Sequence, residues 1–176
     1  MMPRPAMPAC GGFGGGMKRN AFQIVAICAL AFMADQATKW LILNVVMIPP
    51  RIIGVTPFFN LRLGFNSGIS FGLFSDFFER HPLVLAAVKL VIVFGLLIWA
   101  FRSSSRHERL GLALIAGGAL GNTLDRHRQG AVTDFLDFYW NGWHYPTFNM
   151  ADVFITLGAG MLMIASLRGT GKTVAT

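Results

Sequence analysis

The sequence predicts an all-α integral membrane protein with four transmembrane helices, and two observations support this prediction. Hydrophobic residues make up 54% of the 176-residue chain and charged residues only 13%, whereas an average soluble domain carries about 25% charged residues. The charged residues are also clustered, which leaves apolar stretches close to the ~20 residues that a bilayer span requires. A soluble enzyme is therefore not expected, and the content of Leu, Ile, Val and Phe excludes a disordered chain.

Four apolar stretches define the predicted helices. Pro82, at the start of the second stretch, suits a first helical turn, and Gly117 and Gly121 in the third are spaced for close packing between helices. The predicted parts of the chain are a disordered N-terminal tail at 1–17, a membrane domain at 18–168 with helices at about 21–46, 82–101, 110–124 and 151–167, and a cytoplasmic tail at 169–176.

Basic residues flank the predicted helices in three groups and indicate the orientation of the chain. The groups are Arg4, Lys18 and Arg19, then Arg102, Arg106 and Arg109, then Arg168 and Lys172. The positive-inside rule places all three in the cytoplasm, with both termini. The two long connections, 47–81 and 125–150, then lie outside. Residues 58–63 partly alternate between polar and apolar, which predicts a small strand platform on the outer membrane surface.

The remaining composition excludes several classes of function. The net charge of +7 is explained by the excess of Lys and Arg that membrane proteins carry in their cytoplasmic loops. No basic stripe or RNA-binding motif predicts a nucleic-acid partner. Cys10, Cys28 and the four scattered histidines show no metal-ligand spacing. The sequence predicts neither a metal ion nor a cofactor.

Four carboxylates are expected at one depth near the outer face of the bundle. At 1.5 Å per residue, Asp35 lies about 21 Å along the first helix, in the outer leaflet of a hydrocarbon core about 30 Å thick. Asp125 ends the third helix, Asp134 follows on the same side, and Asp152 is the second residue of the last helix. Ionisable groups at such a depth are costly and are functional candidates.

Structural roles compete with function at three of these four positions. Asp35 and Lys39 lie one helical turn apart and could form a paired, snorkelling couple. Asp125 lies among polar residues at a helix end, which favours a supporting hydrogen-bonding role. Asp152 could be a first-turn acid stabilised by the helix dipole. Asp134 has no partner nearby in sequence and no cap to form, so it is the best catalytic candidate.

Two carboxylates forced together in a poorly hydrated site share one proton. Such a pair supplies a base that activates water and an acid that protonates a carbonyl oxygen, which is the chemistry of aspartic peptide hydrolysis. A small transporter or proton relay is the alternative, because membrane carboxylates are equally typical of transporters. A non-catalytic assembly or lipid-binding protein is a further alternative, and it would tolerate Asp-to-Asn changes.

Five sequence blocks in order resemble those of bacterial lipoprotein signal peptidase, the signal peptidase II family. The resemblance covers about residues 18–168. The blocks are Asp35-Gln36-Ala37-Thr38-Lys39, Asn66-Ser67-Gly68-Ile69-Ser70-Phe71, Gly117-Gly118-Ala119-Leu120-Gly121-Asn122-Thr123-Leu124-Asp125-Arg126, Val132-Thr133-Asp134-Phe135 and Phe148-Asn149-Met150-Ala151-Asp152.

The resemblance implies an aspartic endopeptidase of the bacterial inner membrane, with Asp134 and Asp152 as the catalytic dyad. The implied partners are membrane lipids and diacylglyceryl-modified prolipoproteins, cut on the amino side of the lipidated Cys by a monomeric enzyme. The site would lie near the periplasmic face, with segment 47–81 forming a β cradle and segment 125–150 a loop over the active site. The implied supporting residues are Asp35, Lys39, Asn66, Asn122, Asp125, Arg126 and Asn149.

Overall fold

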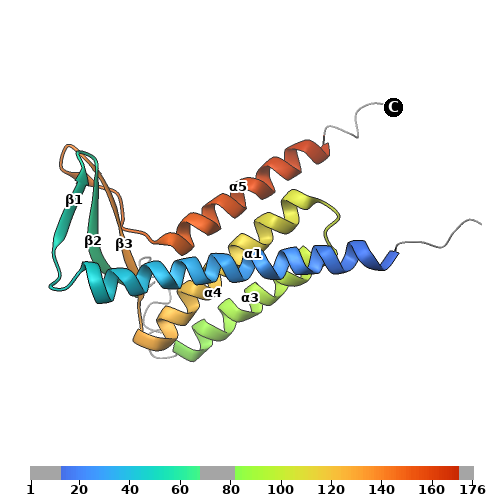
Figure 1. The fold of residues 1–176 in the computed structure, drawn as a ribbon, viewed down its shortest axis with the longest axis horizontal. Helices are drawn as coiled ribbons and strands as arrows, with labels where there is room; N and C mark the ends of the chain where they lie inside the picture. Colours follow the sequence, from blue (N-terminus) through green and yellow to red (C-terminus); the bar gives the residue numbers. More distant parts are fainter. Residues whose placement is uncertain (1–12, 68–81, 171–176) are drawn as a thin grey trace, which may run out of the picture.

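The computed structural model describes residues 13–67 and 82–170, which form four long α-helices and a four-stranded sheet. The helices are α1 (Phe13–Leu41), which continues into the π-helical turn η1 (Ile42–Val46), α3 (Pro82–Arg102), α4 (Arg106–Gln129) and α5 (Met150–Thr170). The strands are β1 (Ile52–Thr56), β2 (Phe59–Asn66), β3 (Val132–Trp140) and β4 (Trp143–His144). Figure 1 shows the sheet at one end of the helices, and the start of α1 and the end of α5 at the other end.

α4 is the central helix, because it packs against α1, α3 and α5. Its glycines permit this close approach. A Cβ atom on Gly117 would lie 2.5 Å from the carbonyl oxygen of Cys28 in α1, and one on Gly118 would lie 2.5 Å from that of Ala151 in α5. A Cβ atom on Gly121 would collide with the carboxylate of Asp35. The predicted packing role of this glycine segment is therefore confirmed.

The helices are longer than their apolar stretches predict. α1 begins at Phe13, so residues 13–17 are helical and the predicted disordered tail is wrong there, while residues 1–12 lie outside the described residues. Extending an existing helix costs far less than nucleating one, so the polar and Gly-rich residues before the apolar stretch continue it. At the other end of the chain α5 reaches Thr170, and residues 171–176 are outside the described part.

α4 shows the same extension, and its ends are capped. Ser105 accepts a hydrogen bond from the backbone N–H of Glu108 at 3.4 Å, and Gly130, with φ of 78°, closes the other end by donating its N–H to the carbonyl of Arg126. Caps satisfy the backbone groups that a helix end leaves without partners. The charged residues beyond 110–124 therefore stay helical, although hydropathy alone excludes them.

The sheet corrects the prediction for segment 125–150, which was expected to be a loop. It contains the last turn of α4 and the strands β3 and β4, and β3 pairs antiparallel with β2. Asn141 and Gly142 both have positive φ and join β3 to β4 in the manner of a two-residue hairpin turn. In segment 47–81 the predicted strands are confirmed by β1 and β2, while their position on the outer membrane surface stays a prediction. Residues 68–81 are outside the described residues.

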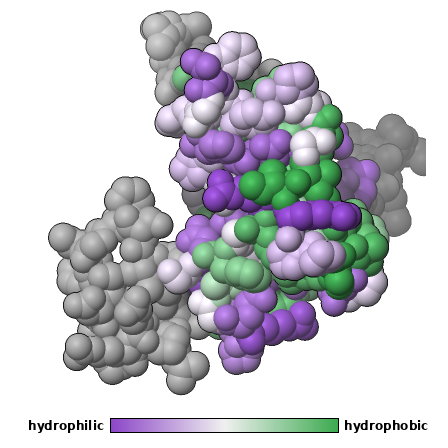
Figure 2. All heavy atoms as spheres, turned by 90° about the vertical axis from the view of Figure 1, so that its left-hand side faces the viewer, coloured by the Kyte–Doolittle hydropathy of each residue, from purple (hydrophilic) through white to green (hydrophobic). Residues whose placement is uncertain are grey.

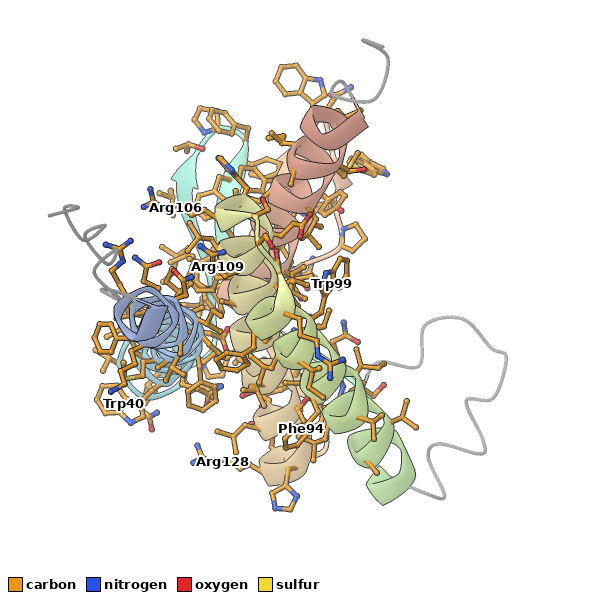
Figure 3. The ribbon with its side chains drawn as sticks, turned by 90° about the vertical axis from the view of Figure 1, so that its right-hand side faces the viewer. Trp40, Phe94, Trp99, Arg106, Arg109 and Arg128 are labelled. Atoms are coloured by element: carbon orange, nitrogen blue, oxygen red, sulfur yellow. The ribbon has the colours of Figure 1, made fainter. Side chains whose placement is uncertain are left out.

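The outer surface of the helices is strongly apolar. Trp40, Val91 and Phe94 are each more than 60% exposed, and Trp40 points away from the other helices in Figure 3. Large exposed apolar surfaces mark a protein or membrane interface. Two described segments, 18–46 and 150–167, meet the length and hydropathy that a membrane span requires.

Candidate active site

The two candidate catalytic carboxylates come from different elements and meet at the end of the bundle beside the sheet. Asp134 is on β3 and is 2% exposed, and Asp152 is in the first turn of α5. The Nδ2 group of Asn149 donates to Asp134 Oδ1 at 2.6 Å and to Asn122 Oδ1 at 3.2 Å. Asn122 Nδ2 in turn donates to Asp152 Oδ1 at 3.0 Å. Two asparagines therefore link both carboxylates.

Asn149 and Asp152 also cap the helix that carries Asp152. Asn149 Oδ1 accepts the N–H of Asp152 at 3.1 Å, and Asp152 Oδ2 accepts the N–H of Asn149 at 3.2 Å. This reciprocal pair is a capping box with Asp in place of the usual Glu or Gln. The prediction of a first-turn acid at Asp152 is confirmed. The same carboxylate also bonds to Asn122, so capping does not account for all of its contacts.

The environment of Asp134 favours its protonated form. Burial is the largest effect and raises the pKa of this carboxyl group, and the nearby charge of Asp152 raises it further. Hydrogen bonds from Asn149 and Asn66, with the charge of Lys39, act in the opposite direction. The net direction is upward, which is the behaviour expected of a buried carboxylate beside a second acid.

Lys39 is the centre of a buried ionic group that lies next to the two candidate carboxylates. Its Nζ, on a side chain that is 3% exposed, lies 2.8 Å from Asp35 Oδ2, 2.8 Å from Asp125 Oδ2 and 2.9 Å from Asn122 Oδ1. Asp35 and Lys39 are therefore paired, as one interpretation of the sequence proposed, but they are buried and do not snorkel to the surface. Because the same Asn122 bonds to Asp152, this group is directly connected to the candidate catalytic carboxylates.

The two other carboxylates of this group hold neighbouring elements in place. Asp35 Oδ1 accepts the N–H of Ala151 at 2.9 Å, which fixes the start of α5 against α1. Asp125 Oδ2 accepts the N–H of Thr133 at 3.3 Å, immediately before Asp134 on β3. The supporting hydrogen-bonding role predicted for Asp125 matches this contact. The four carboxylates thus lie together at the sheet end of the bundle, as their positions along the sequence predict.

Arg126 and Asn66 complete the set of residues identified from the sequence. Arg126 donates to the carbonyl of Asn122 at 3.4 Å, and its charge attracts those of Asp134, Asp152 and Asp125. Its Nε atom is buried and has no hydrogen-bond partner among the described residues. A buried donor without a partner is costly, so this guanidinium is available for a group that enters the site.

Gln36 belongs to the site and was not identified as a site residue from the sequence. Its Nε2 donates to Asp125 Oδ1 at 3.0 Å, to Asp35 Oδ2 at 3.2 Å and to the carbonyl of Gly121 at 3.3 Å. A polar side chain directly beside Asp35 in an otherwise apolar helix is the signal that could have indicated it.

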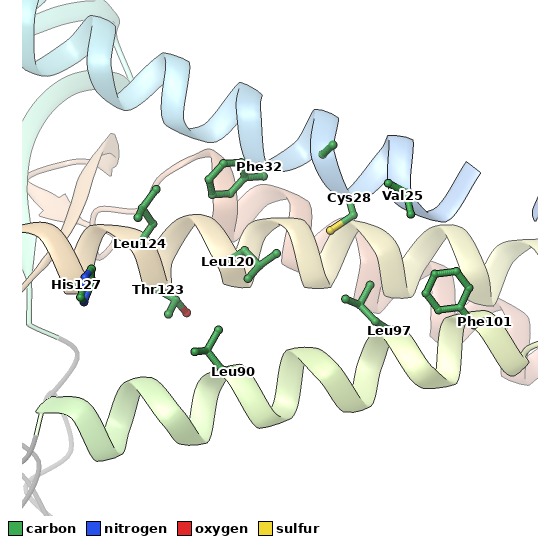
Figure 4. A pocket seen from close by; sticks show the side chains of 11 residues that line it. Val25, Cys28, Phe32, Leu90, Leu97, Phe101, Leu120, Thr123, Leu124 and His127 are labelled. Carbon is green, nitrogen blue, oxygen red and sulfur yellow. The ribbon is translucent and has the colours of Figure 1, made fainter. Parts of the chain in front are cut away.

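An open pocket gives access to Asp134. Its volume is about 330 Å³, and its lining residues are Gly64, Phe65, Asn66, Ser67, Asp134, Pro146 and Thr147. A larger cavity of about 560 Å³ lies between α1, α3 and α4, where Leu90, Leu97 and Leu120 face inward (Figure 4). The lining of this second cavity is almost entirely apolar and contains no carboxylate, so the site chemistry belongs to the smaller pocket.

Comparison with known proteins identifies the family of the chain. A family model described as signal peptidase (SPase) II matches residues 27–168. The chain belongs to that family. It is 36% identical over 154 residues to a lipoprotein signal peptidase of Serratia marcescens, covering 88% of this chain and 90% of the relative. A lipoprotein signal peptidase of Aeromonas hydrophila is 39% identical over 149 residues, covering 83% and 89% of the two chains.

Two solved structures share the fold. One is a bacterial membrane enzyme determined by the in meso method at 2.3 Å resolution, with a TM-score of 0.74 and 26% identity over 88% of this chain and 93% of the other. The second, determined by the same method at 1.9 Å, has a TM-score of 0.70 and 28% identity over 83% and 93%. The chain is therefore a membrane protein of a family of proteases that process lipoproteins.

Proposed function

We propose that this chain is an aspartic endopeptidase that removes signal peptides from diacylglyceryl-modified prolipoproteins, cutting on the amino side of the lipidated Cys. The observation that carries the proposal is the Asn149–Asn122 link, which holds Asp134 and Asp152 in one partly dehydrated site. The family membership of the chain and the names of its relatives supply the substrate class.

In the proposed mechanism the two carboxylates share one proton and activate a water molecule between them. The raised pKa of Asp134 makes it the protonated member, which donates to the oxygen of the scissile carbonyl. Asp152, ionised, accepts a proton from the attacking water. The roles then reverse, and the proton held by Asp152 passes to the departing amine.

The supporting residues keep this geometry during the reaction. Lys39, Asp35 and Asp125 form the buried ionic group that fixes Asn122, and Asn149 orients both acids. Arg126 and Asn66 lie beside Asp134 with donors that can bind carbonyl oxygens of the substrate. No step in this scheme requires a metal ion or a cofactor.

For the membrane arrangement we propose that all four long helices span the bacterial inner membrane, with the sheet and the dyad near the periplasmic face. Both termini would be cytoplasmic and the enzyme monomeric. The position of the sheet at one end of the helices, opposite the start of α1 and the end of α5, supports this orientation (Figure 1). A lipidated Cys anchored at the membrane surface would bring its scissile bond to that depth.

The test is cleavage of a diacylglyceryl-modified prolipoprotein by the purified protein in detergent. Asp134→Asn and Asp152→Asn keep the size of each side chain and remove its acid–base function, so each should reduce kcat by at least about a thousandfold. Glu108→Gln is the matched control, because Glu108 bonds to Ser103 near the start of α4, far along the helix from the dyad. Cleavage by either Asn variant at the wild-type rate would contradict the dyad, and no cleavage by the wild type would contradict the function.

A further inference from the structure

A second polar pocket continues from the pocket that contains Asp134. Its volume is about 320 Å³, and it is lined by Arg62, Leu63, Gly64, Asp137, His144, Tyr145, Pro146 and Thr147. Gly64, Pro146 and Thr147 line both pockets. The two cavities are therefore neighbours along the face of the sheet, and a chain bound at the dyad could extend from one to the other.

The acid in this second pocket is fully engaged by protein groups. Asp137 is 0% exposed, and its two oxygens lie 2.9 and 3.0 Å from His144 Nδ1. Asn60 Nδ2 donates to its Oδ2 at 3.3 Å. The sheet produces this group, since Asn60 and Asp137 are opposite each other in the β2–β3 pairing. The carboxylate is buried and held, so it does not offer a free negative charge to a ligand.

The exposed charge of the pocket is therefore positive. Arg62 is exposed on β2 and forms no ion pair within the described part of the chain. His144 is 40% exposed on its side chain, and its Nδ1 is occupied by Asp137, so Nε2 is left for other contacts. An arginine without a partner pairs readily with a carboxylate, and can do so through two parallel hydrogen bonds.

We propose that this pocket is a specificity subsite that receives the residues following the lipidated Cys and favours an acidic side chain there. The proposal rests on the proposed peptidase function. The residues that line the pocket indicate the direction in which the bound substrate runs. The lining residues come from β2, β3, β4 and the segment before α5, and none comes from a helix. An apolar signal peptide stays along the helices, so the segment that leaves the dyad over the sheet is the downstream, mature part of the substrate.

The surface at this end is suited to such a segment. Figure 2 shows the molecule from the sheet end, where hydrophilic and hydrophobic residues lie side by side. The sheet also exposes large apolar side chains such as Phe65 and Trp140, but within the pocket a polar polypeptide would meet Arg62, His144 and Thr147. Electrostatic selection at an exposed arginine is modest in size, because water screens an exposed pair.

The experiment measures kcat/KM for three lipidated substrates that differ only in the residue after the lipidated Cys, which is Asp, Asn or Lys. The same series is repeated at the next position. Wild type should cleave the Asp substrate up to about fivefold faster than the Asn substrate, and the Lys substrate more slowly than either. Arg62→Gln should reduce the Asp-to-Asn ratio to about one, and Arg62→Glu should make Lys the preferred residue. Arg51→Gln removes an exposed charge just before β1 and outside the pocket, so it should keep the wild-type ratio.

The outcomes separate the two proposals. Equal cleavage of the three substrates by wild type at both positions, or an unchanged preference in Arg62→Gln, would overturn the subsite and leave the peptidase intact. Failure of wild type to cleave any substrate would overturn the peptidase, and the subsite with it. A ratio reduced equally by Arg51→Gln would show that net charge, and not this pocket, selects the substrate.

Discussion

Lys39 balances two buried acids, and this makes it the residue on which the stability of the site depends most. Its ammonium lies 2.8 Å from both Asp35 and Asp125. Removing one partner of a buried ionic group leaves an uncompensated charge, which typically costs about 3–5 kcal/mol. We therefore expect Lys39→Met to lower the free energy of unfolding by that amount, as measured by circular dichroism during unfolding with SDS in mixed micelles.

The matched control for this change is Lys18→Met. Lys18 is exposed near the start of α1, so losing its charge should change the free energy of unfolding by no more than about 0.5 kcal/mol. Equal stability of the two variants would show that the buried acids are hydrated or protonated without their lysine. Partial recovery in Lys39→Met combined with Asp35→Asn would support the electrostatic explanation, because the second change removes one of the two unpaired charges.

At the scale of the elements, the contact between α4 and α5 determines where Asp152 lies. A Cβ atom on Gly118 would lie 2.5 Å from the carbonyl oxygen of Ala151, a backbone atom that cannot move without moving the first turn of α5. Overpacking of this kind typically costs about 1–3 kcal/mol. Gly118→Ala should therefore lower both the free energy of unfolding and kcat, because α5 and its carboxylate are displaced together.

Gly95→Ala is the control for this element-scale prediction. Gly95 lies in α3, and a Cβ atom there would meet nothing within 4 Å. Alanine favours a helix over glycine by about 1 kcal/mol, so this variant should be as stable as wild type or more stable, with unchanged activity. Normal activity in Gly118→Ala would mean that α5 can shift without moving the dyad, contrary to the packing seen here.

The elements also show how far the sequence could predict the site. The positions of the acids on apolar helices were enough to bring Asp35, Asp125 and Asp152 to one end, because a helix has a fixed rise per residue. The strand β3 was not predicted, since its pairing depends on β2 far away along the chain. The Asn141–Gly142 pair was the available signal for the β3–β4 hairpin. The Asp137–His144 contact was not predicted because it depends on recognising that hairpin, which brings the two side chains together.

For the whole molecule, the proposed peptidase function requires that the end of the bundle that carries the sheet face the compartment in which the substrate is cut. Arg106 and Arg109 lie at the opposite end, shown in Figure 3, beside the start of α1. Basic residues at one end of a helical bundle indicate its cytoplasmic side. The carboxylates sit at the sheet end and not midway along the helices, which favours the peptidase over a transporter with its site at the bilayer midplane.

Single cysteines at the two ends of the protein would test this orientation. In a background with Cys10→Ala and Cys28→Ala, Asn141→Cys places a thiol in the exposed β3–β4 turn, and Ser104→Cys places one in the exposed connection before α4. A membrane-impermeant thiol reagent should label the first variant in intact spheroplasts and the second only after the membrane is opened. The reverse pattern would place the dyad on the cytoplasmic side, where a lipidated substrate at the outer surface could not reach it. Labelling of both variants in intact spheroplasts would contradict the membrane arrangement itself, because α4, the helix that connects the two positions, would then not separate them by a bilayer.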